Sequence, residues 1–281
     1  MAFTKIPAAT NRIVDFTSSG TWVCPSGVYS AEFMVVGAGG GGGGTSVSSA
    51  TFYAAGAGGG GGAVKYAKLV TIPGASYTIT IGAKGTGSSG AVGGNGGYSE
   101  IVYSGTTLIR SFGGQGGGAC VSDASTLGTL SRTIAGAGGA GTPATTGSER
   151  LAPGGGGASV ISSTVNLTTN SRNYGAEGSG GNTQVATRAS RWTTFGQPGI
   201  DGYGAGGSGG VADSEASTFN TSGASYFAGV GVILNATGAT NGGAAVANTG
   251  CGGGGGASYL SASSTAGGNG ADGLIRIEYF A

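Results

Sequence analysis

Residues 31–44 read AEFMVVGAGGGGGG: six residues typical of a strand lead directly into eight residues of which only Ala38 is not glycine. The same unit, an apolar segment followed by a glycine run, recurs to the C-terminus. The stretch therefore predicts one architecture that is repeated with variations. The glycine runs are residues 37–44, 56–62, 82–97 in looser form, 113–118, 136–141, 154–157, 202–210, 250–256 and 267–273.

An ordered glycine run must be held by its backbone, because glycine has no side chain to pack and loses the most conformational entropy on folding. In polyproline-II geometry there are three residues per turn, and the N–H and C=O groups point outward. Several such helices can hydrogen-bond laterally, since glycine lets backbones approach closely. Eight residues would span roughly 25 Å. A single run is most simply a flexible linker, but nine runs favour an ordered bundle.

The segments between the runs predict strands. Residues 31–36 are apolar on both faces except at Glu32, which indicates a strand inside a sandwich. Residues 274–280 alternate with a period of two. No window shows a capped helical repeat, so the class is all-β plus polyglycine. Further strands are predicted at residues 16–23, 64–72, 76–81, 98–103 and 107–112, with hairpin-like turns at Pro73-Gly74 and Ser104-Gly105.

Composition excludes several classes of protein. Of 281 residues, 68 are glycine and six are proline, without the strict Gly-X-Y period of collagen. Twelve Lys and Arg against eleven Asp and Glu give a net charge of +1, with no basic patch for nucleic acid. The N-terminus lacks a signal-peptide pattern and no stretch approaches eighteen apolar residues. We therefore expect a soluble protein that is not secreted through a signal peptide and does not insert into a membrane.

Residues for chemistry are sparse. The sequence has no histidine, which removes the commonest general base and metal ligand. Cys24, Cys120 and Cys251 are widely spaced and predict free thiols. Asp213 and Glu215 form the only close carboxylate pair, most simply a solvated loop. G-x-G-x-x-G matches are inevitable at this glycine content. We expect no enzyme activity, no cofactor and no metal.

Aromatic and arginine side chains gather where the glycine scaffold gives way, in the inserts at residues 158–203 and 211–240 and in the shorter loop at 45–55. Such side chains give large contact areas for recognition and can stack on sugar rings. The alternative is that they form small satellite cores holding long loops together. The candidate receptor-binding residues are Phe52, Tyr53, Arg172, Tyr174, Arg191, Trp192, Phe195, Phe219, Tyr226 and Phe227.

A series of motifs resembles the glycine-rich domain of bacteriophage tail fibres and receptor-binding (adhesin) proteins. The resemblance covers both ends of the sequence, while the middle matches only in glycine content. It implies a jelly-roll-like β-sandwich whose strand connections form polyglycine-II helices, with receptor contacts made by loops at the tip of the glycine slab. The motifs are Phe16 and residues 20–28 GTWVCPSGV, 37–40 GAGG, 73–82 PGASYTITIG, 93–99 GGNGGYS and 270–279 GADGLIRIEY.

From the resemblance we expect a virion protein at a phage tail or fibre tip, made in the host cytoplasm, that binds a bacterial surface glycan or outer-membrane protein. Other virion tail proteins would be partners, and a homotrimer is compatible with the family. Residues 1–15 would be an attachment arm and 16–281 a single domain. Alternatives are a purely structural capsid or tail decoration protein, an ice-binding polyglycine protein and, last, an enzyme.

Overall fold

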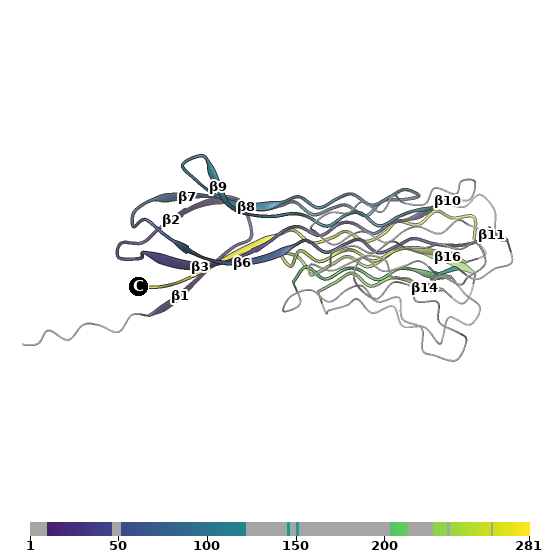
Figure 1. Cartoon of the computed structure of the whole chain (residues 1–281). Coiled ribbons are helices and arrows are strands. Elements are labelled where there is room, and N and C mark those ends of the chain that lie inside the picture. The colour runs from purple at the N-terminus through teal and green to yellow at the C-terminus, as the bar shows by residue number, and fades with distance from the viewer. Residues whose placement is uncertain are drawn as a thin grey trace, which may run out of the picture.

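The computed structural model describes residues 10–46, 52–121, 145–146, 150–151, 203–212, 227–234, 237–259 and 261–281. These residues form strands and extended segments and contain no helix, which confirms the all-β class. Figure 1 shows an elongated molecule with broad strands at one end, called here the sandwich end. Long extended segments lead from it to a second set of short strands, the far end.

Two four-stranded antiparallel sheets form the sandwich end. Strand β3 lies inside its sheet, between β17 and β6, as its apolar sequence predicts. The jelly-roll-like connectivity is not confirmed by this strand order. The first sheet has the order β1 (Asn11–Phe16), β17 (Leu274–Phe280), β3 (Ser30–Val36) and β6 (Val64–Val70); the second has β2 (Gly20–Val23), β7 (Ser76–Thr80), β8 (Ser99–Tyr103) and β9 (Thr106–Ser111).

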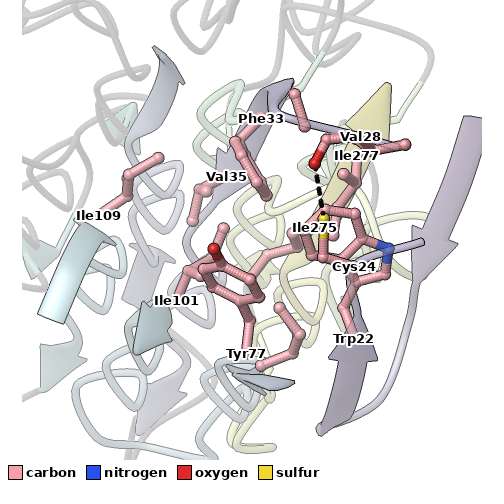
Figure 2. Close-up of a cluster of buried hydrophobic side chains, with 12 residues drawn as sticks. Trp22, Cys24, Val28, Phe33, Val35, Tyr77, Ile101, Ile109, Ile275 and Ile277 are labelled. Carbon is pink, nitrogen blue, oxygen red and sulfur yellow. Dashed lines mark hydrogen bonds between the residues drawn. The ribbon is translucent and has the colours of Figure 1, made fainter. Parts of the chain in front are cut away.

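The facing sides of the two sheets enclose one apolar core (Figure 2). The Trp22 ring meets the Phe33 ring edge-on, with the ring centres 5.8 Å apart. Cys24 is a buried free thiol, and its Sγ donates to the Val28 carbonyl oxygen at 3.2 Å. The alternation predicted for residues 274–280 is confirmed, since Ile275 and Ile277 lie in this core. Other core members are Val35, Tyr77, Ile79, Ile101 and Ile109.

Three details differ from the sequence predictions. Residues 16–23 are not one strand: β1 ends at Phe16 and β2 begins at Gly20 in the other sheet. The turn at Pro73-Gly74 is no hairpin, because β6 and β7 belong to different sheets. Residues 11–15, assigned to the arm, lie in β1. The predicted Ser104-Gly105 hairpin is confirmed, with both residues at positive φ (46° and 77°) between paired strands.

The run at residues 37–44 lies at the centre of the glycine bundle and is bonded to six other runs. Successive N–H groups from Gly37 to Thr45 donate in rotation to three antiparallel runs at distances of 2.8 to 3.3 Å, with a period of three. That period is the signature of polyglycine-II packing. The three acceptor runs are 57–63, 91–97 and 265–271; the three that donate to its carbonyls are 82–88, 113–118 and 250–256.

The run at residues 250–256 is a second centre with six bonded neighbours. Two of these neighbours, residues 227–232 and 241–245, are not among the runs found in the sequence. The looser run at 82–97 proves to be two antiparallel runs joined by a turn near Gly90. Predicted runs at 136–141 and 154–157 lie outside the described residues. We call the bonded set of runs the lattice.

Glycine is required in the lattice for steric reasons. A Cβ atom built on any of Gly37 or Gly39 to Gly44 would lie only 1.8 to 2.2 Å from a backbone oxygen of a neighbouring run. Elsewhere small side chains fit: Ala205, Ala228 and Cys251, all buried, pack together from three different runs. The backbone separation, and with it every lateral hydrogen bond, therefore depends on the missing side chains.

Buried hydroxyl groups join the sandwich to the lattice. Ser99 Oγ donates to the Val36 carbonyl oxygen at 2.7 Å and accepts from the Gly82 N–H at 3.0 Å. Ser111 Oγ donates to the Val35 carbonyl oxygen at 2.7 Å. These bonds fix the point at which strands end and runs begin.

Short strands close the far end (Figure 1), where the runs leave the lattice. They form a four-stranded sheet of order β11-β5-β16-β15, a three-stranded sheet β12-β13-β14 and a parallel pair β10-β4. The strands are β4 (Thr45–Ser46), β5 (Phe52–Ala55), β10 (Cys120–Val121), β11 (Thr145–Thr146), β12 (Arg150–Leu151), β13 (Val211–Ala212), β14 (Ile233–Leu234), β15 (Gly238–Thr240) and β16 (Ala257–Tyr259).

We predict that Gly42→Ala destabilises the protein by about 3 kcal/mol or more, because the new Cβ would lie 2.0 Å from the Gly254 oxygen and overpack the lattice. Gly20→Ala is the matched control, since its Cβ would meet only a Phe16 ring carbon at 3.9 Å. Denaturant unfolding measures both. Equal stability of the two variants would contradict the lattice packing.

We also predict that Ser99→Ala lowers the free energy of unfolding by about 1–3 kcal/mol, because it leaves a buried carbonyl and a buried N–H without their partner. Ser111→Ala removes one hydrogen bond and should have a smaller effect. Ser76→Ala, at an exposed strand position, should have almost none. A reversed order of the three variants in thermal unfolding would show that these hydroxyls do not hold the junction.

Candidate functional site

The described termini and the far-end strands lie at opposite ends of the molecule (Figure 1). The Thr10 N–H donates to the Ala281 oxygen at 2.9 Å, and the Ala281 N–H donates back at 3.1 Å. Both residues extend the edge of the sandwich where β1 pairs with β17. The lattice, about eight residues or 25 Å deep, separates this edge from the far end.

Two of the predicted receptor-binding residues, Phe52 and Tyr53, lie in strand β5 at the far end. The Tyr53 backbone pairs with Tyr259 of β16 on one side and with Thr145 of β11 on the other. Strand β5 is therefore an inner strand of the largest far-end sheet, and it leads directly into the lattice run at residues 56–63.

Phe227 has a different position from Phe52 and Tyr53. Its ring lies against Tyr203, with the ring centres 6.0 Å apart, and it packs on the Ala205, Ala228 and Cys251 cluster. Tyr203 in turn packs against Met34, Val36 and Leu274, on the outer face of the β1-β17-β3-β6 sheet. These contacts place Phe227 beside the sandwich and give it a packing role.

The other predicted receptor-binding residues lie outside the described part of the structure. They are Arg172, Tyr174, Arg191, Trp192, Phe195, Phe219 and Tyr226.

Hydroxyl groups mark the described surface of the far end. At the same end the Oγ1 atoms of Thr45 and Thr265 lie 2.8 Å apart, but both residues are buried. The exposed residues nearby carry small uncharged side chains that can donate and accept hydrogen bonds. Such a surface suits neutral hydrogen-bonding groups better than ions. The exposed hydroxyl residues are Ser89, Thr240, Ser263 and Ser264.

Charged pairs lie mainly in the sandwich. Arg276 Nε and Nη2 each donate to an Asp15 oxygen at 2.7 Å, and this hydrogen bonding raises the pKa of Arg276 above its usual range. Arg110 pairs with Glu100 at 2.7 Å on the other sheet. Within the described ranges, no three His, Cys, Asp or Glu side chains come together to hold a metal ion. In those ranges there is also no apolar helix long enough to span a membrane.

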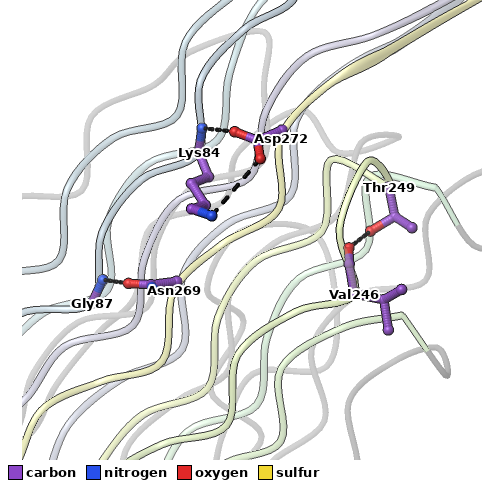
Figure 3. A network of polar contacts seen from close by, with 6 residues as sticks. All are labelled: Lys84, Gly87, Val246, Thr249, Asn269 and Asp272. Carbon is purple, nitrogen blue, oxygen red and sulfur yellow. Dashed lines mark hydrogen bonds and ion pairs between the residues drawn. The ribbon is translucent and has the colours of Figure 1, made fainter. Parts of the chain in front are cut away.

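Side chains also complete the lattice at its edge, an arrangement that sequence reasoning missed. Asn269 Oδ1 accepts from the Gly87 N–H and Asp272 Oδ1 from the Lys84 N–H, both at 2.8 Å (Figure 3). In each case the next residue, a glycine, donates its own N–H to the same neighbouring run. We call this arrangement, an Asn or Asp followed by glycine and bonded twice to a neighbour, an Asx-Gly clasp.

Four clasps occur among the described residues. Asn95 accepts from the Gly116 N–H at 2.9 Å and Asn241 from the Ala266 N–H at 2.8 Å. A clasp supplies a side-chain oxygen to an N–H that has no further run beside it to supply a carbonyl. The sequence signal for it is an Asn-Gly or Asp-Gly pair inside a glycine run; two of the four pairs, at Asn95 and Asp272, lie in the motifs of the family resemblance.

Comparison with known protein families gives a match over most of the sequence. The model of a family described as "Glycine-rich domain" matches residues 15–280, almost the whole sequence. No curated protein matches it.

We predict that Asn95→Ala lowers stability by about 1 kcal/mol, because the Gly116 N–H loses its acceptor. Asn95→Asp is the matched control and should keep most of the stability, since Asp272 makes the same contact in the wild type. Thermal unfolding distinguishes the two. The clasp has no energetic role if both variants melt like the wild type.

Proposed function

The chain belongs to the family of glycine-rich domains, and from this premise we propose that it is a bacteriophage receptor-binding protein, a tail-fibre or tail-tip adhesin. In this proposal it binds a bacterial surface glycan or outer-membrane protein without catalysing a reaction. The observation that carries the proposal is the placement of Thr10 and Ala281, the described ends, and of the far-end strands at opposite ends of a lattice. An adhesin must be attached at one end and present its recognition surface at the other.

The lattice provides the ordered support that recognition loops need. A recognition loop binds more tightly when its anchors are already ordered, because less conformational freedom is lost on binding. At the far end, strands such as β4 and β5 continue directly from runs 37–44 and 56–63. The bonds between those runs fix the positions from which loops leave. Attachment through the sandwich end, with residues 1–15 contributing, would leave the far end free for a host receptor.

The chemistry of the far end favours a neutral receptor such as a glycan. Hydroxyl groups are exposed there, and the aromatic candidates Phe52 and Tyr53 belong to its largest sheet. Aromatic rings stack on sugar rings, while hydroxyls exchange hydrogen bonds with sugar hydroxyls. With only 8% of its residues charged, the protein has little means of binding a strongly charged surface.

The second candidate function, a structural virion protein without receptor binding, would use the same lattice as a stiff spacer. It predicts stable incorporation into the particle and no affinity for host cells. Binding of the purified protein to host cells separates the two functions.

We predict saturable binding of the labelled full-length protein to intact cells of a susceptible host, with loss of binding after surface polysaccharide is stripped. The double variant Arg191→Ala, Trp192→Ala should weaken cell binding by roughly thirtyfold or more, as expected when a recognition hot spot is removed. Flow cytometry over a concentration series gives the apparent affinity.

The control is Tyr29→Ala, which removes an exposed aromatic ring at the sandwich end. It should bind cells like the wild type, and unfolding curves should confirm that both variants are folded. Binding that survives stripping would point to an outer-membrane protein. Absence of binding across a broad host panel would contradict the adhesin proposal and favour the structural one.

A further inference from the structure

Three of the eleven asparagines in the sequence are followed by glycine, at positions 95, 241 and 269. All three are the asparagines of Asx-Gly clasps. Asn-Gly is chemically the least stable asparagine pair, because the unhindered glycine nitrogen can attack the side-chain amide. All three pairs lie at the edge of the lattice, where the asparagines are exposed to solvent.

The lattice leaves little choice about either residue. The clasp needs a short side-chain oxygen, which Asn or Asp supplies in all four cases. The following residue must be glycine: a Cβ on Gly96, Gly242 or Gly270 would lie 2.1 to 2.3 Å from a backbone oxygen of another run. A reactive pair is thus a consequence of the lattice geometry.

The hydrogen bonds of each clasp oppose the reaction of that pair. Gly270 N–H, the group that would attack, donates to the Gly85 oxygen at 2.9 Å. The Asn269 amide oxygen accepts at the same time from the Gly87 N–H at 2.8 Å. Both bonds must break before the backbone is free to rotate and bring the glycine nitrogen onto the asparagine Cγ.

The other two clasps are held in the same way. Gly96 N–H donates to the Gly114 oxygen at 2.8 Å while Asn95 accepts from Gly116 at 2.9 Å. Gly242 N–H donates to the Ala266 oxygen at 2.9 Å, and Asn241 accepts from the N–H of that same residue. Protection in all three comes from bonding and not from burial.

We propose that Asn95, Asn241 and Asn269 are sites of spontaneous deamidation whose rate is set by local opening of the lattice edge. In the open form the glycine N–H loses its proton to hydroxide, and the nitrogen forms a bond to the asparagine Cγ. Nδ2 takes a proton from water, which restores the hydroxide; the bond between Cγ and Nδ2 breaks and ammonia leaves, which gives a succinimide. Water then adds to one of the two ring carbonyls and opens the ring to aspartate or isoaspartate.

The two products have different consequences for the lattice. Aspartate keeps the acceptor oxygen, as Asp272 shows by accepting from Lys84. Isoaspartate inserts an extra carbon into the backbone and shifts every later residue of the run out of its three-residue period. The lateral bonds beyond that point then cannot re-form, so each isoaspartate opens the edge permanently.

The test is to incubate the full-length protein at mildly alkaline pH and to measure aspartate and isoaspartate at each asparagine by peptide mapping and mass spectrometry. Synthetic peptides with the same local sequences, such as GGNGA for residues 267–271, give the unprotected rate in the same buffer. We expect deamidation at the three clasps to be at least roughly tenfold slower than in the peptides, because it requires local opening.

A parallel incubation in urea, where the lattice is unfolded, should bring all three sites to the peptide rate. Asn11, which is followed by arginine, serves as an internal reference with little reaction in any condition. Native rates equal to the peptide rates would overturn the proposal. Equal rates in the native and urea samples would overturn it too, because unfolding the lattice would then make no difference to the rate.

Discussion

The structure depends on lateral hydrogen bonding between glycine backbones. A buried N–H or C=O without a partner is costly, so a bundle of extended runs can exist only if nearly all these groups are paired. Pairing requires the close backbone approach seen at Gly42, where an added Cβ would lie 2.0 Å from the Gly254 oxygen. The six-neighbour arrangement of run 37–44 is the solution, since its donors and acceptors point to a different neighbour at each of three successive residues.

Such a lattice cannot fix its own register, because one glycine is like the next. The sandwich supplies the register, since strands β3, β6 and β17 continue into runs without an intervening loop. Ser99 holds the boundary by bonding to both a strand carbonyl and a run N–H. The edges pose the opposite difficulty, because the outermost N–H groups have no further run to meet. Asn95 and Asp272 resolve it with side-chain oxygens.

The elements that could be predicted from the sequence are those whose signal is local. The alternation at 274–280 and the apolar block at 31–36 identified two strands almost to the residue. Runs 227–232 and 241–245 are not predicted from the sequence because residues such as Val230 and Ala244 dilute their glycine content. Each clasp has a local signal, an Asn or Asp followed by glycine, but the sequence does not show which N–H it binds: Asn269 and its donor Gly87 are 182 residues apart. The loop sequence predicts Phe227 as a recognition residue, and no nearby residue pattern indicates the Tyr203 ring on which it packs.

The distribution of hydrogen bonds gives the lattice and the far end different roles. Among the described residues, the bonds that position run 37–44 come from the backbone of other runs and not from far-end side chains. Sequence change beyond β4 or β5 therefore alters the far-end surface without removing a bond of this run, whereas a methyl group added at any glycine of the run would clash with a neighbouring backbone. If the far end is the recognition surface, as we propose, its sequence can change while the supporting lattice stays the same. A scaffold of this kind suits a binding protein whose target changes faster than its own framework can.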